Sequence, residues 1–204
     1  MDDSIYILYY IALMKSFRAV HDLASPRAGE RFRVNVIGYR QRFRRAIAEA
    51  GVQCSYFVFM FYERVSVMTD DGMQEVAPYS MVIARPYSPI SHGRPGPFRR
   101  SWIRCAGSGV AEACRGAGVP FNTALNFDGP DMNERFLLDI HRELTHPRGS
   151  DQRTVFDLFR LWMRSVSRDA LGGGRAPVPE SFLKARQYVE SHFCESFSLD
   201  SVAS

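Results

Sequence analysis

Residues 54–84, CSYFVFMFYERVSVMTDDGMQEVAPYSMVIA, carry the densest β-forming signal in this 204-residue chain. The run from Cys54 to Tyr62 is dense in aromatic and β-branched residues and is long enough for a buried strand. Further along, the Asp71-Gly72 pair is a strong hairpin signal. The strands predicted in this stretch are 54–62, 65–68, 73–76 and 79–84.

The sequence on either side extends the β pattern. Val34–Gly38 is a short apolar strand closed by glycine, and a last strand is expected at about Phe98–Ala106. Tyr87–Pro97 is rich in Pro, Gly and Ser and is predicted to be a loop. Tyr39–Gly51 alternates like a strand as far as Phe43 and then has the pattern of a polar connection. Its four arginines are interpreted as a solvated face in preference to a nucleic-acid-binding patch. Short strands at this spacing predict a small barrel or sandwich.

From Asp131 onward the apolar residues recur at helical spacing. A first helix is expected from Asp131 to Leu144, and Glu134 completes a plausible capping arrangement at its start. A longer helix is expected at about 151–170. Its apolar stripe is wide enough to bury more than one side, either against the strands and the preceding helix or against a second copy of the chain. That stripe consists of Val155, Leu158, Phe159, Trp162 and Val166.

Residues 171–179, LGGGRAPVP, are typical of a linker because a flexible glycine run is followed by two prolines. Beyond them, residues 180–193 place their apolar side chains on one helical face. Ser198 is positioned to cap a second helix, whose buried side begins with Leu199 and Val202. Helix, turn and helix in this order open the helix-turn-helix DNA-binding motif, although periodicity alone also fits an ordinary helical hairpin. The sequence ends before any recognition helix.

The segment KARQYVESHFCESFSLDSVAS, residues 184–204, resembles the start of the DNA-binding domain of the AraC family of bacterial transcription regulators. A second resemblance lies in the strands, where residues 85–92 and 101–107 are similar to a turn and a strand of the family's sensor domain. Two departures are visible there: Arg104 stands where the family often has His, and Cys105-Ala106 replace a bulky pair. The residues of the tail that match the family pattern are Ala185, Tyr188, Val189, His192, Phe193, Phe197, Ser198, Leu199, Val202 and Ala203.

The resemblance implies an α+β protein. Its sensor half would be a cupin-like, jelly-roll β-barrel, followed by a helical dimerisation segment and the start of an all-α helix-turn-helix domain. The expected boundaries are 1–33 for an N-terminal arm of uncertain role, 34–126 for the barrel, 127–170 for the helical segment, 171–179 for the linker and 180–204 for the truncated DNA-binding domain.

The resemblance also assigns roles to particular residues. Trp102 matches the aromatic residue that stacks on ligand in sugar-binding relatives, and His92 and Arg100 lie near positions that supply hydrogen bonds there. From the residues alone, Trp102 also fits a core aromatic, His92 an exposed turn residue, and Arg100 a surface charge like its neighbour Arg99. The residues expected to mediate dimerisation are Leu158, Phe159, Trp162 and Val166, and none of the residues present is expected to contact DNA bases.

Composition narrows the remaining possibilities. A net charge of +4 permits contact with nucleic acid without demonstrating it. The four cysteines form no C-x-x-C pair, so reduced thiols of a cytoplasmic protein are expected. The five histidines include no pair one residue apart, so neither a metal site nor a cofactor is predicted. Residues 5–14 form too short an apolar run to span a bilayer. No nucleophile elbow, P-loop or dinucleotide motif is present, and an enzyme is not expected.

Two functions from different classes follow. The chain is predicted to be the sensing and dimerising part of an AraC-like regulator, a homodimer that binds a small effector, such as a sugar, and reaches DNA through the full-length protein. The alternative is a stand-alone protein that pairs with a full-length regulator and inhibits it. A cupin-fold enzyme is disfavoured because the paired metal-binding histidines are missing.

Overall fold

The structure is a computed structural model that describes residues 16–21, 30–48 and 54–172. The chain divides into two compact units, residues 1–171 and 172–204, and all the elements given below belong to the first. The predicted helix-turn-helix segment 180–204 lies outside the described residues, as does nearly all of the predicted linker 171–179.

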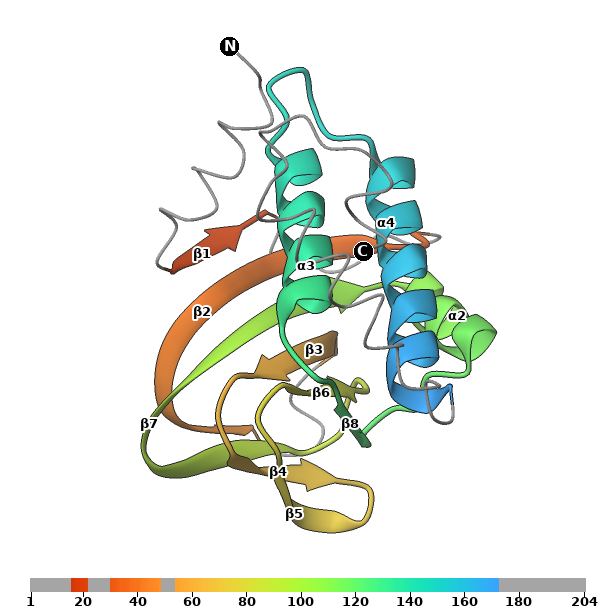
Figure 1. Cartoon of the computed structure of the whole chain (residues 1–204). Coiled ribbons are helices and arrows are strands. Elements are labelled where there is room, and N and C mark those ends of the chain that lie inside the picture. The colour runs from red at the N-terminus through yellow and green to blue at the C-terminus, as the bar shows by residue number, and fades with distance from the viewer. Residues whose placement is uncertain (1–15, 22–29, 49–53, 173–204) are drawn as a thin grey trace, which may run out of the picture. The chain divides into compact units, whose positions relative to one another are not determined.

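Eight antiparallel strands form one sheet around two long, bent central strands (Figure 1). Its main path is β1 (Phe17–Val20), β2 (Arg33–Ala48), β7 (Ile90–Ala106), β3 (Tyr56–Phe61), β6 (Ser80–Ala84) and β8 (Ala124–Asn126). The remaining two strands form a hairpin in which β4 (Val65–Thr69) pairs with both β7 and β5 (Gly72–Val76).

The predicted β-barrel is not closed. The path ends at β1 on one side and β8 on the other, and no ladder joins these two strands within the described ranges. Both are short edge strands, of four and three residues, so they offer little backbone with which to close the sheet. The sheet is an open, strongly curved structure with a concave and a convex face.

The two central strands are longer than predicted. β7 begins at Ile90, inside the expected loop, and β2 continues through Ala48 instead of turning into a polar connection after Phe43. Pro95 and Pro97 are tolerated in β7 because the register with β2 shifts there, between the partners of Phe43 and those of Arg45. Proline and glycine therefore marked an irregularity in a strand and not its end.

Both faces of the sheet are buried, which explains the unbroken apolar run in β3. Phe57, Phe59 and Phe61 point to the concave face, whereas Val58 and Met60 belong to the core under the helices. A strand covered on both sides loses the polar alternation of a half-exposed one. The hairpin between β4 and β5 forms as predicted, with Gly72 at a φ of 99°.

Three helices cover the convex face and complete its core. α3 (Asp131–Leu144) and α4 (Gln152–Val166) are the two predicted helices and lie side by side (Figure 1); α4 ends in a π-helical turn, η1 (Ser167–Leu171). α2 (Ser108–Ala117) was not predicted, because it contains two glycines and only a short apolar stripe. No helix within the described ranges is both long and apolar enough to cross a membrane.

One buried hydrogen bond fixes the relative position of α3 and α4. The indole Nε1 of Trp162, a fully buried side chain, donates to Oδ1 of Asn133 at 2.8 Å. Asn133 is itself only 4% exposed, so water cannot replace it as the acceptor.

We therefore expect Asn133→Ala to destabilise the protein by about 1–3 kcal/mol, because the indole N–H loses its only partner while it stays buried. Urea unfolding measures the change, with the exposed α4 substitution Gln152→Ala as control. Trp162→Phe should cost less in the Asn133→Ala variant than in the parent, since the donor that it removes has already lost its acceptor. A double variant whose loss equals the sum of the two single losses would contradict the interaction.

Candidate functional site

The concave face of the sheet holds an aromatic cluster. Phe57, Phe59 and Phe61 of β3 follow one another at every second residue, with ring centroids 5.3 and 6.2 Å apart. Two residues of β7, Phe98 and Trp102, extend the same surface. The ring centroid of Phe98 lies 6.4 Å from that of Phe61, and the centroid of Trp102 lies 6.1 Å from that of Phe57. We call this face, with the side chains described below, the concave cluster.

Trp102 is held in the concave cluster from β2. Its indole Nε1 donates to Oε1 of Gln41 at 2.9 Å. Its register partner on β2 is Gly38, and a Cβ built on Gly38 would lie 2.2 Å from the same Nε1. Only glycine therefore leaves room for the indole at this position. The guanidinium of Arg18 on β1 lies over the other side of the site, 5.9 Å from the Trp102 ring centroid.

Arg100 is a buried cation without a counter-ion. It is 7% exposed, and its guanidinium lies over the rings of Phe43 at 3.7 Å and Phe59 at 5.2 Å. Within the described part of the chain, no hydrogen bond or ion pair is made by its side chain, and Nε and Nη1 are both buried. Burial lowers the pKa of Arg100 to about 9, because the charged form loses its hydration.

His92 lies beside Arg100 in the same cluster. It is 2% exposed, packs on Phe59 and Phe61 at 4.7 and 5.1 Å, and leaves its Nε2 without a partner. Burial, and secondarily the positive charge of Arg100, lower the pKa of His92 to about 2, so the ring is neutral at physiological pH. A hollow of about 270 Å³ lies where β4, β5 and β7 meet, and His92 is one of its lining residues. The other residues that line it are Ser66, Met73, Ser91, Gly93 and Arg94.

The structure thus brings the three sequence-predicted residues Trp102, His92 and Arg100 into one site. Arg100 and Arg99 are separated by strand alternation: Arg99 is exposed and forms an ion pair with Glu63 at 2.8 Å. Sequence reasoning missed Gly38 and Gln41, which position the indole, although a glycine inside an apolar strand is a known sign of close approach. Within the described residues, no group of three or more His, Cys, Asp or Glu side chains is arranged to hold a metal ion.

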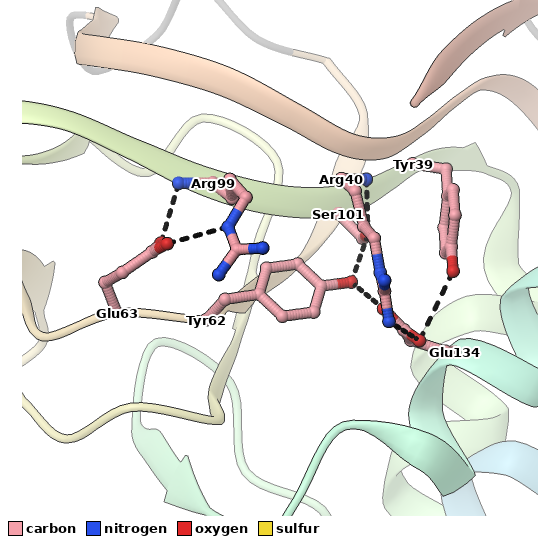
Figure 2. Close-up of polar contacts among 7 residues, drawn as sticks. All are labelled: Tyr39, Arg40, Tyr62, Glu63, Arg99, Ser101 and Glu134. Carbon is pink, nitrogen blue, oxygen red and sulfur yellow. Dashed lines mark hydrogen bonds and ion pairs between the residues drawn. The ribbon is translucent and has the colours of Figure 1, made fainter. Parts of the chain in front are cut away.

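On the opposite face of the same strands, a buried polar network ties the sheet to α3 (Figure 2). Glu134, 7% exposed, accepts from Nε and Nη2 of Arg40, both at 2.7 Å. It also accepts from the hydroxyls of Tyr62 and Tyr39. Ser101 completes the network, because its Oγ accepts from the Arg40 backbone N–H at 2.9 Å and lies 2.6 Å from the Tyr62 hydroxyl.

This network replaces the predicted capping role of Glu134. Pro130 is the N-cap of α3 and makes no side-chain capping bond, while the Glu134 side chain turns to the sheet. Burial, and then the adjacent Glu134 carboxylate, raise the pKa of Tyr39 to about 12 and raise that of Tyr62 as well. The hydrogen bond with Glu134 raises the pKa of Arg40. The tyrosines thus stay protonated donors to a paired carboxylate.

The predicted dimerisation residues lie mostly inside the chain. Phe159, Trp162 and Val166 are fully buried in the core between the helices and the sheet, and Leu158 packs half-buried at its edge. The first three therefore cannot form a surface for a second chain in this fold. Of the two possibilities that the sequence left open, intrachain packing accounts for them. The exposed apolar residue of α4 is Leu161, at 51%.

The fit between Gly38 and the indole can be tested by Gly38→Ala. The added methyl group must displace the Trp102 ring and break its bond to Gln41, so we expect a loss of about 1–3 kcal/mol and a changed tryptophan emission. Gly116→Ala in α2 is the matched control, because its Cβ meets nothing within 4 Å and alanine favours a helix. Unchanged stability and emission in Gly38→Ala would show that the ring is not held there.

The neutral state of His92 predicts acid sensitivity. A histidine whose pKa is lower folded than unfolded binds its proton mainly in the unfolded state, so stability is fully present above about pH 6.5 and falls as the pH drops toward 2. His92→Phe should reduce this slope by up to about 1.4 kcal/mol per pH unit below pH 6.5.

Urea unfolding between pH 7.5 and 5 measures the slope. Burial also lowers the pKa of His21 and of His141, so these two residues contribute to the slope with the same sign. The slope of His92→Phe is therefore compared with the slope of the parent protein, because neither is expected to be zero. The exposed His146→Gln is the control. A His92→Phe slope equal to that of the parent would mean that His92 accepts its proton in the folded state.

No protein-family model and no curated protein sequence matches the chain. Among solved structures, it is similar to the AraC-like transcriptional activator CuxR, with 12% identity, a TM-score of 0.43 and coverage of 96% of this chain and 78% of that one. A second similar structure is ToxT from Vibrio cholerae O395 bound to (E)-4-(8-methylnaphthalen-1-yl)but-3-enoic acid. Its sequence identity is 11%, the TM-score is 0.41, and the similarity covers 84% of this chain and 70% of that one. A cupin superfamily protein from Desulfitobacterium hafniense DCB-2 has 11% identity and a TM-score of 0.29, with coverage of 44% of this chain and 76% of that one. Similarity at this level assigns no function.

Proposed function

We propose that residues 30–171 contain the ligand-sensing domain of an AraC-like transcription regulator, and that a small effector binds in the concave cluster. The observation that carries the proposal is the pair of buried polar side chains, Arg100 and His92: Nε and Nη1 of Arg100 and Nε2 of His92 have no hydrogen-bond partner among the described residues. Trp102 stands in the same cluster. A few polar groups among apolar walls are what small-molecule sites consist of.

The energetic argument is that the site is costly when empty. A buried polar group without a hydrogen bond destabilises a protein by about 1–3 kcal/mol, and by more when it is charged. The aromatic rings under the Arg100 guanidinium offset part of this cost but accept no conventional hydrogen bond. A ligand that supplies the missing acceptors gains that energy on binding.

The regulatory part of the proposal is supported by the tail of the sequence. Residues 184–204 resemble the opening of the AraC-family DNA-binding domain. A ligand that favours one arrangement of a homodimer would change the affinity of paired DNA-binding domains by linkage. The proposed role is therefore binding and signalling, not catalysis, and DNA is the proposed partner of the helix-turn-helix domain. Any contact between two copies along α4 would use its exposed side at Leu161.

A compound screen on the full chain tests the sensor function. A ligand that binds only the folded state raises the melting temperature by mass action, and one that reaches the concave cluster also changes the emission of Trp102. We expect at least one metabolite class among organic acids, sugars and nucleotides to do both. Trp102→Phe should remove the emission change and leave the signal of Trp162. The proposal fails if no class shifts either signal, or if the emission change persists in Trp102→Phe.

A further inference from the structure

We propose that the ligand of the concave cluster is an organic monoanion, a carboxylate on a flat apolar body, bound by Arg100. This inference rests on the proposed function, because it specifies which molecule the site takes. It differs from the sugar that the sequence resemblance suggests. The argument depends on charge, on hydrogen-bonding capacity and on the shape of the surrounding surface.

The charge of the cluster is unbalanced. Arg18, Arg100 and Arg104 each lie over an aromatic ring of the cluster, at 5.9 Å from Trp102, 3.7 Å from Phe43 and 5.9 Å from Phe57. Within the described ranges, no acidic side chain is ion-paired or hydrogen-bonded with any of these three. In a site of low polarity, an uncompensated positive charge favours an anion over a neutral molecule.

A single negative charge is the best match. Arg104 is half-buried and already donates to the Ser55 hydroxyl at 3.0 Å, and Arg18 is exposed to solvent. Arg100 is therefore the one cation of the three that is both buried and without a hydrogen bond. A carboxylate brings one charge and acceptor oxygens for a guanidinium. A phosphate brings up to two charges, and its second charge would have no buried partner.

Hydrogen-bonding capacity argues against a sugar. A sugar carries several hydroxyl groups, and each needs a partner when it is buried. Apart from its arginines, the concave cluster offers the neutral His92 and the amide N–H groups of Gln41, whose Oε1 already accepts from the Trp102 indole. The rest of the surface consists of aromatic and aliphatic side chains. Such walls favour a flat apolar body over a polyhydroxylated one.

Charge and hydrogen-bonding capacity together describe a carboxylic acid on an aromatic or unsaturated apolar body.

The test compares matched acids and amides on the full chain. Cinnamate with cinnamamide and octanoate with octanamide differ in charge while keeping nearly the same shape; phenyl phosphate and D-glucose extend the panel. Calorimetric titration should show cinnamate binding at least about 30-fold more tightly than cinnamamide, which is the size of a buried charged hydrogen bond. Arg100→Gln should abolish this preference, whereas the exposed control Arg42→Gln should retain it.

Each outcome bears on the inference separately from the sensor function. If an amide binds as tightly as its acid, or if only D-glucose or phenyl phosphate binds, the carboxylate class is wrong while a ligand-binding concave cluster stands. If the panel and the broader screen both give no binding, the sensor function falls with it. Should Arg100→Gln fail to fold, the acid-to-amide ratio of the unaltered protein decides, with Arg100→Lys as the variant that keeps the charge.

Discussion

The antiparallel ladder between β2 and β7 is the constraint on which the rest of the molecule depends. β7 pairs with β2 along one edge and with β3 and β4 along the other, so it spans nearly the whole sheet. Alternation along β7 then assigns each residue to a face: Arg100 and Trp102 turn to the concave cluster, and Ser101 and Ile103 turn to the helices. The two faces of β7 therefore contribute to the concave cluster and to the core under the helices, respectively.

Arg100 shows how such a strand can retain a costly group. An isolated cation in an apolar environment is expensive to bury, and proteins avoid it unless the charge is compensated. Here the compensation is partial, since the rings of Phe43 and Phe59 attract the guanidinium without accepting a conventional hydrogen bond. The fold therefore keeps a buried polar group with unsatisfied hydrogen-bond donors, which is a feature of binding sites more than of structural cores.

Much of the architecture could be predicted from local signals, and the failures have physical causes. The β4–β5 hairpin and helices α3 and α4 follow from turn chemistry and periodicity. The length of β7 did not, because Pro95 and Pro97 look like strand breakers when the bulge that accommodates them depends on a partner strand. The sequence also could not predict that the sheet is open, because closure depends on whether the short edge strands β1 and β8 pair with each other.

The three predicted residues lie in one cluster of the structure, but their environment could not be predicted from the sequence. Trp102, His92 and Arg100 were singled out by resemblance, yet sequence alone left each with a structural alternative. Arg100 and Trp102 are two residues apart on one strand and therefore share a face. No local sequence signal shows that this face is concave and buried. The indole's support from Gly38 and Gln41 depends on register across strands, which no single segment encodes.

The bulge between Gly38 and Gln41 joins the two faces by the shortest possible covalent route. Arg40 adopts a left-handed backbone conformation with a φ of 45°, uncommon for a residue with a side chain. It directs its guanidinium to Glu134 on α3, while the next residue, Gln41, holds the Trp102 indole on the other face. The ion pair with α3 and the hydrogen bond to the indole therefore start from adjacent residues of one bulge. A substitution that changes the backbone conformation at Arg40 is thus expected to affect both contacts.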